Sequence, residues 1–193
     1  MTSPRGLRNN NPLNIRHSAS RWQGARAKQT DKSFVQFTSI TMGYRAAWRI
    51  LESYYNYYEK KQTPFTPRNI IQRRAPSTEN DSEAYLKAIC RLTTLAGNEA
   101  LMRPSLARIQ SREQSVQSTE NRVQPPCGLE AESSNSSETA SYPHDDTYTA
   151  QDLQAKFKLI DLLAAMTCIE NGIAMADVDR DAIEEALTRA FKD

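Results

Sequence analysis

Apolar side chains recur at the three- and four-residue spacing of amphipathic helices in several separate parts of the chain. This spacing predicts helices over residues 41–61, 66–71, 80–96, 149–170 and 179–191. It places Tyr54 and Tyr58 on the packed face of the first helix. Expected helix starts are Thr66 before Pro67 and Asn80 three residues before Glu83, and expected stops are Gly97 and Gly172. Residues 17–38 carry short extended pieces instead, whose apolar positions around Phe34 and Phe37 predict a small β-hairpin. The predicted fold class is therefore α+β and mainly α.

A change of composition divides the chain into three parts. Residues 105–148 are rich in Ser, Thr, Gln, Glu, Asn and Pro and have almost no apolar periodicity. Such a segment cannot bury enough apolar surface to offset the entropy lost when its backbone is ordered. We therefore expect residues 105–148 to be a disordered linker or insertion. Residues 1–104 and the helices of residues 149–193 would then pack together as one domain.

Charge is distributed unevenly along the 193 residues, whose net charge is +2. Residues 1–74 hold 14 Lys and Arg against 3 Asp and Glu, whereas the rest of the chain has an acidic excess. A basic half suits an anionic polymer, either nucleic acid or a carboxylate-bearing cell-wall glycan. Because no zinc finger, RNP pattern or basic helix with heptads accompanies it, nucleic acid is not the expected partner.

Metal and cofactor chemistry is not expected from the cysteines and histidines. Cys90, Cys127 and Cys168 are odd in number and far apart, and His17 and His144 are the two histidines. Neither set has the spacing of a metal site, and a histidine-dependent triad is equally unsupported. We therefore expect no metal and no cofactor.

The chain has no run of about 18 apolar residues and no apolar N-terminal segment, so neither a membrane span nor a secretory signal is expected. The expected location is the cytoplasm or a virion. A protein of this kind that acts on the periplasm or cell wall would have to be delivered there by another component.

Residues 5–16 are dense in amide and guanidinium groups and lack a core-forming pattern. Three asparagines precede Pro12, which fixes its own φ angle and denies the helical region to Asn11. The stretch therefore predicts a tight, rigid turn. Two interpretations are open: a structural loop whose amides satisfy its own backbone, and a surface built to hydrogen-bond a ligand.

Further motifs follow this Arg-Asn-Asn-Asn-Pro-x-Asn-Ile-Arg stretch in a fixed order. They are Trp-x-Gly at residues 22–24, Phe-x-x-Phe at 34–37, Gly-Tyr-Arg-Ala at 43–46, Ala-Pro-Ser-Thr-Glu-Asn-Asp at 75–81 and Glu-Asn-Gly at 170–172. In this order the motifs resemble a family of short proteins from phages, prophages and gut Bacteroidales, described as virion structural or lysozyme-like proteins. The resemblance covers roughly residues 4–100 and 155–190.

The resemblance implies a lysozyme-like fold that cleaves peptidoglycan as a muramidase or lytic transglycosylase. Lysozyme-like enzymes, including lytic transglycosylases and glucosaminidases, place a glutamate at the C-terminal end of a buried helix, and residues 162–172 look like that helix. Here the helix follows the asparagine-rich turn instead of preceding it. A circular permutation would reconcile the two orders, and it predicts that Glu170 lies beside Asn10 and Asn14.

Glycoside cleavage needs a carboxylic acid that protonates the leaving oxygen, and a second carboxylate or a substrate group that completes the displacement. Glu170 is the predicted general acid/base. Asp31 is a candidate second carboxylate, which a transglycosylase would not need. The predicted substrate-binding residues are Arg8, Asn10, Asn11, Asn14, Arg16, Trp22 and Glu79. The open alternatives are a helix-end role for Glu170 and a helix-stabilising role for Glu79.

Two positions depart from the family pattern. Leu13 stands where relatives usually have Gly, and Arg74 stands where many have a Trp that could stack on sugar. The alternatives to an enzyme are therefore a non-enzymatic virion-associated structural protein and a glycan- or protein-binding module. The expected partners are peptidoglycan glycan strands, with phage virion or secretion-apparatus proteins as further candidates.

Overall fold

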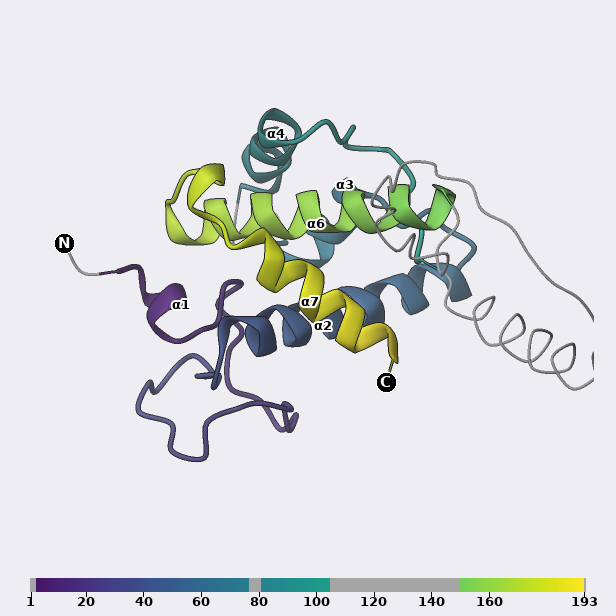
Figure 1. The fold of residues 1–193 in the computed structure, drawn as a ribbon. Coiled ribbons are helices and arrows are strands. Elements are labelled where there is room, and N and C mark those ends of the chain that lie inside the picture. Colours follow the sequence, from purple (N-terminus) through teal and green to yellow (C-terminus); the bar gives the residue numbers. More distant parts are fainter. Residues whose placement is uncertain (1–2, 77–80, 105–149, 193) are drawn as a thin grey trace, which may run out of the picture.

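The computed structural model describes residues 3–76, 81–104 and 150–192, which form helices joined by loops (Figure 1). The helices are α1 (Arg5–Arg8), α2 (Ile40–Lys60), α3 (Pro67–Arg74), α4 (Ser82–Leu92), α6 (Ala150–Asn171), the short 3-10 helix η1 (Met175–Asp177) and α7 (Arg180–Lys192). The described chain is thus mainly helical, as the apolar spacing predicts. None of its helices combines the length and the apolar character needed to cross a membrane. The predicted linker at residues 105–148 lies outside the described residues.

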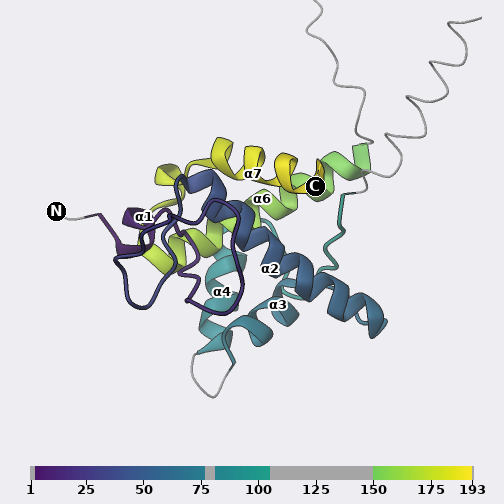
Figure 2. The ribbon, with the colours of Figure 1, turned by 90° about the horizontal axis from the view of Figure 1, so that it is seen from below.

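Helices from both ends of the chain share one core. Helix α6 packs against α4 and α7, and α7 packs along α2 (Figures 1 and 2). Tyr54 and Tyr58 lie partly buried against this core, which confirms the packing role that their helical spacing predicts. The core contains, among others, the fully buried side chains of Trp48, Leu51, Leu162, Leu163, Met166 and Ile183.

Short-range side-chain chemistry sets the starts of the helices. The hydroxyl of Thr66 accepts a hydrogen bond from the Asn69 backbone N–H at 3.2 Å, and Pro67 takes the first helical position, as predicted. Helix α4 begins after Asp81, whose carboxylate accepts from the Ala84 N–H at 2.8 Å. The cap is therefore one residue later than the predicted Asn80, which lies outside the described residues.

Two helices end differently from each other. Helix α4 stops at Leu92, ahead of the predicted stop at Gly97, because Thr93 adopts an extended conformation and its hydroxyl donates to the Ile89 carbonyl at 2.9 Å. Helix α6 ends as predicted. Gly172 has a φ angle of 62° and donates its N–H to the Cys168 carbonyl at 2.8 Å.

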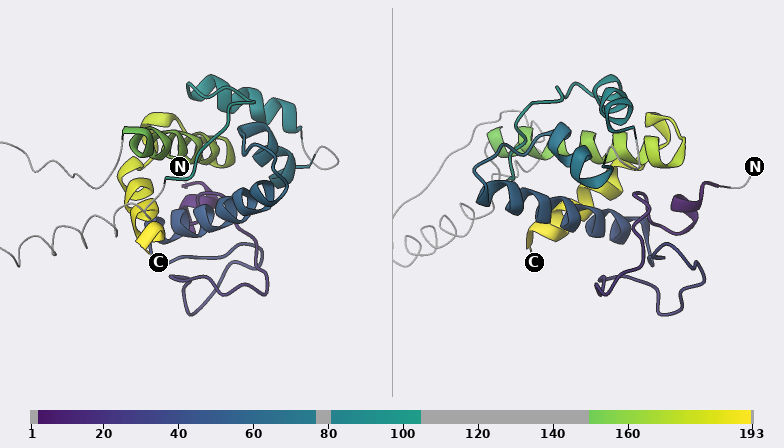
Figure 3. Two further views of the ribbon diagram at one scale, coloured as in Figure 1. Left: turned by 90° about the vertical axis from the view of Figure 1, so that its right-hand side faces the viewer. Right: turned by 180° about the vertical axis from the view of Figure 1, so that it is seen from behind.

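The N-terminal region, residues 5–38, contains one short helix and long loops. In this described region extended pairing amounts to two isolated antiparallel bridges, Arg16 with Phe34 and Ala25 with Phe37. A small apolar cluster of its own includes Ile15, Val35 and Phe37 and packs against Ala46 of α2. Figure 3 shows residues 17–38 extending from the start of α2, on the side of the helices away from α4.

Candidate functional site

Glu170 lies in the last turn of α6, directly after a stretch of the helix that is buried from Leu162 to Cys168. Its side chain is 20% exposed, so the carboxylate stands at the edge of the core and reaches solvent. A negative charge at a helix C-terminus is disfavoured by the helix dipole. Partners outside α6 must therefore stabilise it.

Three side chains donate hydrogen bonds to this carboxylate. Nδ2 of Asn14 lies 3.1 Å from Oε2 of Glu170, and Nη2 of Arg74 lies 3.1 Å from Oε1. The hydroxyl of Tyr85 lies 3.3 Å from the same Oε1. The N-terminal loop, α3, α4 and α6 therefore meet at one carboxylate, although these residues lie up to 156 positions apart in sequence. We call Asn14, Arg74, Tyr85 and Glu170 the carboxylate cluster.

Arg74 joins the cluster to the asparagine-rich turn. Its Nη2 also donates to the backbone carbonyl of Leu13, and its side chain is only 15% exposed. Its Nε is buried and has no hydrogen-bond partner among the described residues. Because the guanidinium is held from two sides, it can hold the Glu170 carboxylate in one orientation.

Tyr85 contributes a protonated hydroxyl. Burial raises the pKa of the Tyr85 phenol above its ordinary value, and the negative charge of Glu170 raises it further. The phenol therefore stays neutral at physiological pH and donates a hydrogen bond to Glu170. The sequence places Tyr85 on a helix within the region of the family resemblance and Arg74 at a departure from the family pattern, and it predicts neither as a partner of Glu170.

Asn14, at the end of the asparagine-rich turn, contacts Glu170 and has a left-handed backbone conformation itself. Asn14 has a φ angle of 50°, a conformation that asparagine tolerates better than most residues. Its Nδ2 also lies 3.3 Å from the backbone carbonyl of Glu170. Asn171 reinforces the contact, because its Nδ2 donates to the Pro12 carbonyl at 2.8 Å.

The absence of a side chain at Gly6 allows the turn to lie close to the end of α6. A Cβ atom at this position would lie 2.3 Å from Oδ1 of Asn171 and 2.9 Å from Oδ1 of Asn14. Only a glycine fits between these two amides without displacing them. The close approach of α1 to α6 thus depends on residue 6.

Asn11 and Asn10 use their amides within the turn. The side chain of Asn11 is fully buried and donates to the carbonyls of Ile15 and Val35, while its Oδ1 accepts from the Ile15 N–H. Asn10 has a φ angle of 52° and donates to the Phe37 carbonyl at 3.1 Å. The structure therefore places both amides in the scaffold of the turn, and it brings only Asn14 of the three to Glu170.

The other predicted binding residues do not join the carboxylate cluster. Arg8 is exposed, and Arg16 is exposed with its guanidinium 5.5 Å from the ring centre of Phe34. Trp22 is partly buried against the small N-terminal cluster. Among the described residues, neither these side chains nor any second carboxylate hydrogen-bonds to Glu170. Glu79 lies outside the described residues.

Asp31 forms its hydrogen bonds within the N-terminal region. It accepts two bonds from the Arg5 guanidinium at 2.7 and 2.6 Å and one from Asn9 at 2.7 Å. The backbone N–H groups of Ser33 and Phe34 also donate to it. These contacts, led by Arg5, hold the pKa of Asp31 far below its ordinary value. Its oxygens are therefore occupied within the N-terminal region.

Residues able to ligate metal do not gather in the described parts of the chain. No three His, Cys, Asp or Glu side chains there lie close enough together to hold an ion. The chemistry available at the carboxylate cluster is that of one carboxylate, one phenol, one guanidinium and one amide.

Comparison with known proteins gives one phage relative. No known family model matches the chain. The chain is 37% identical over 100 residues to Protein P5 of Pseudoalteromonas phage PM2. The matched region is 50% of this chain and 60% of Protein P5, so the chain spans less than two thirds of that relative.

Proposed function

We propose that the chain is a peptidoglycan-cleaving glycosidase in which Glu170 is the general acid/base. The observation that carries this proposal is the contact between Glu170, at the end of a buried helix, and Asn14 of the asparagine-rich turn at 3.1 Å. Glycoside cleavage needs a carboxyl group fixed within reach of the glycosidic oxygen. The Glu170 side chain is fixed by its partners and is 20% exposed, so it meets this geometric requirement. The other side chains of the cluster would position it.

The same contact supports a lysozyme-like fold in permuted order. In that arrangement the glutamate helix, α6, comes late in the chain and packs where an N-terminal helix would otherwise lie. Asn14 and Glu170 are 156 residues apart, yet they touch. The small β region of such a fold would correspond to the loops that the two isolated bridges hold together.

The chemistry that this site favours is that of a lytic transglycosylase. Glu170 would give a proton to the glycosidic oxygen as the bond from that oxygen to the muramyl C1 breaks. The C6 hydroxyl of the same sugar would then form a bond to C1 and return its proton to Glu170, giving a 1,6-anhydro product. Oε2 is the oxygen suited to this transfer, because Oε1 already accepts from both Arg74 and Tyr85.

A muramidase would use water in place of the C6 hydroxyl, and would need a second group to activate or replace that water. Asp31 has its oxygens occupied by Arg5, Asn9 and two backbone N–H groups, so it does not serve this role. The intramolecular route therefore agrees better with the described residues. The exposed Arg8 and Arg16 would attract the carboxylates of the glycan strand.

The relative in phage PM2 supports a phage or prophage origin for the chain. In this proposal the protein is carried in a virion and released at the cell wall. A non-enzymatic virion component is the second candidate. It is supported by the way in which Glu170 ties together the N-terminal loop, α3 and α4, since such a tie also serves stability alone.

The test is muropeptide mass spectrometry after incubation of purified peptidoglycan with the wild-type protein and with Glu170→Gln. We expect the wild type to release 1,6-anhydro muropeptides and Glu170→Gln to release none. Glu185→Gln is the matched control, because Glu185 is another arginine-paired glutamate but lies exposed on α7. Reducing-end products would instead identify a muramidase.

Two outcomes would contradict the proposed chemistry. Equal activity of wild type and Glu170→Gln would remove Glu170 from catalysis. If the wild type is inert and Glu170→Gln is less stable than the wild type, the carboxylate cluster serves stability in a non-enzymatic protein.

A further inference from the structure

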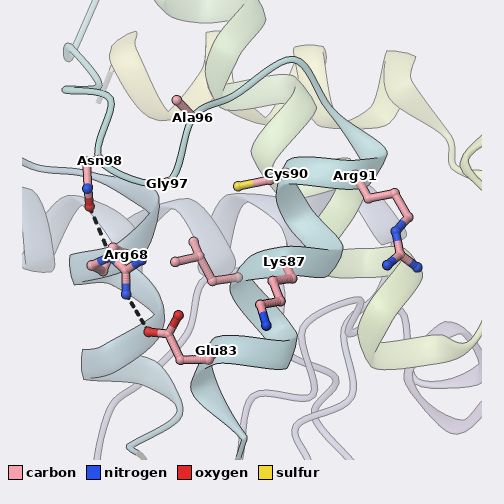
Figure 4. A pocket seen from close by; sticks show the side chains of 9 residues that line it. Arg68, Glu83, Lys87, Cys90, Arg91, Ala96, Gly97 and Asn98 are labelled. Atoms are coloured by element: carbon pink, nitrogen blue, oxygen red, sulfur yellow. Dashed lines mark hydrogen bonds and ion pairs between the residues drawn. The ribbon is translucent and has the colours of Figure 1, made fainter.

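A separate pocket lies between α3, α4 and residues 96–98, as Figure 4 shows. Its volume is about 550 Å³, a size typical of sites for small molecules or short peptides. The residues of α4 that line it include Glu83, Lys87 and Cys90, which lie on a different face of the helix from Tyr85. The pocket is therefore not part of the carboxylate cluster.

One wall of the pocket is apolar. Leu86 lines the pocket and is buried, and the thiol of Cys90 points toward Ala96 and Gly97 in Figure 4. Gly97 lies against Leu86, where an added Cβ would come within 3.2 Å of Leu86 Cδ2. Leu86 and Gly97 are therefore closely packed, and together with Cys90 and Ala96 they present an apolar wall against which small groups such as methyls can pack.

The rim of the pocket is polar and carries positive charge on Arg68, Lys87 and Arg91. Arg68 forms an ion pair with Glu83 and donates to Oδ1 of Asn98 at 3.0 Å, so its charge is already partnered. Lys87 is exposed beside Glu83 and has no hydrogen bond or ion pair within the described part of the chain. Arg91 adds a further positive charge, although its guanidinium points away from Arg68 (Figure 4).

We propose that this pocket binds short peptides that carry small apolar side chains and end in a free carboxylate. Lys87 would pair with the carboxylate, and the wall formed by Leu86 and Cys90 would cover the methyl groups. The second oxygen of Glu83 and the amide of Asn98 would pair with the peptide N–H and C=O groups. Side-chain methyls, amides and a terminal negative charge thus each meet a suitable partner.

Other anionic ligands match the pocket less well. A fatty acid would place hydrocarbon against Glu83 and Asn98 and leave their polar groups without partners. A phosphate would approach the negative charge of Glu83 and would make no use of the apolar wall. The proposal does not rest on glycosidase activity, although the peptide stems of peptidoglycan belong to the proposed ligand class.

Cys90 supplies a reporter within the pocket. We would measure the rate of Cys90 alkylation by iodoacetamide in the full chain, using peptide-level mass spectrometry to separate it from the other cysteines. Acetyl-dialanine with a free carboxylate should slow this reaction in a saturable way. The carboxamide form should need an about tenfold higher concentration for the same protection, because it lacks the charge that pairs with Lys87.

Lys87→Glu should lose the protection by acetyl-dialanine, whereas Lys60→Glu, an exposed lysine at the end of α2, should retain it. Thermal unfolding of both variants checks that the fold is intact. No protection in the wild type, equal protection by acid and carboxamide, or retained protection in Lys87→Glu would each overturn the proposal. Protection by inorganic phosphate or decanoate, but not by acetyl-dialanine, would overturn it in favour of a general anion or fatty-acid site.

Discussion

The helical core and the N-terminal region of this protein are held together by different forces. The core of α2, α6 and α7 buries large apolar side chains such as Trp48 and Leu163. Residues 5–38 bury a much smaller apolar cluster and depend on hydrogen bonds between the loops and three side chains. Asn11 donates to a loop carbonyl, whereas Gln36 and Asp31 accept from loop N–H groups. Apolar burial tolerates small shifts of position, whereas hydrogen bonds require particular partners.

The carboxylate cluster lies where these two regions meet. Asn14 comes from the region held by hydrogen bonds, and Glu170 comes from the end of the apolar helix α6. A helix fixes the position of a carboxylate, and a polar loop supplies amides that hydrogen-bond to it. Both are available at the boundary between the two regions. Substitutions in the two regions should therefore act through different physical terms, which the following experiments separate.

The largest effect is expected for Asn11→Leu, which keeps the side-chain size but removes its hydrogen bonds. The Val35 carbonyl and the Ile15 N–H would lose their partners inside the protein. At roughly 1–3 kcal/mol for each unpaired buried group, the free energy of unfolding should fall by about 4 kcal/mol. Urea denaturation measures this loss, with the exposed Asn56→Leu as control. A loss as small as that of the control would show that hydrogen bonds do not hold this region.

In the helical core, Leu163→Ala tests apolar burial. Leu163 is fully buried in α6, so its truncation leaves a cavity and should lower the free energy of unfolding by about 3 kcal/mol. Leu92→Ala, at a partly exposed position of α4, should cost under about 1 kcal/mol. Equal losses at the two positions would contradict the assignment of the core.

A smaller and pH-dependent effect is expected for Asp31→Asn. Because contacts with Arg5 and Asn9 hold the pKa of Asp31 below its ordinary value, the folded state keeps the carboxylate ionised in mild acid. Its contribution to stability is complete above about pH 5 and declines as the pH falls below about 4, where the unfolded chain takes up the proton.

Melting temperatures of wild type and Asp31→Asn between pH 3 and pH 7 measure this dependence. The difference between the two proteins should be greatest at neutral pH and should shrink in acid. Asp177→Asn, at an exposed position of η1, is the control. A difference that does not change with pH would mean that Asp31 stabilises the region by shape and not by charge.

The smallest effect is expected at the end of α6, for Gly172→Ala. The φ angle of Gly172 is 62° and an added Cβ would meet no atom within 4 Å, so the cost is backbone strain alone. That strain should lower the free energy of unfolding by about 1 kcal/mol. Gly6→Ala should cost more, because its Cβ would clash with Asn171 and Asn14. Equal costs would show that the close approach of the turn to α6 does not depend on Gly6.

The helices could be predicted from the sequence because apolar spacing and capping residues depend only on neighbouring positions. Apolar spacing and the caps at Thr66 and Gly172 predict α2, α3, α6 and α7 to within a few residues of their observed ends. The early end of α4 at Thr93 was missed, because a side-chain hydroxyl competing for a helix carbonyl leaves little trace in the apolar pattern.

The candidate site was predictable only in part. The pairing of the asparagine-rich turn with Glu170 follows from a family resemblance and a permutation argument, and the structure places Asn14 against that carboxylate. Arg74 and Tyr85 were not anticipated as partners of Glu170. An arginine in the last turn of a helix and a tyrosine on the packed face of a helix are both common. The local sequence around Arg74 in α3 and Tyr85 in α4 therefore does not mark either residue as a partner of Glu170.

By itself, the sequence determined where the helices lie, the caps at Thr66 and Gly172 and the tight turn at Pro12, because periodicity, capping and φ restriction act over a few residues. Only the tertiary structure decided which amide of that turn meets Glu170, and that Asn11 is buried while Asn14 faces the carboxylate. Such choices depend on contacts between residues 24 to 156 positions apart. Their energies arise only once the helices have packed and excluded water from the groups between them.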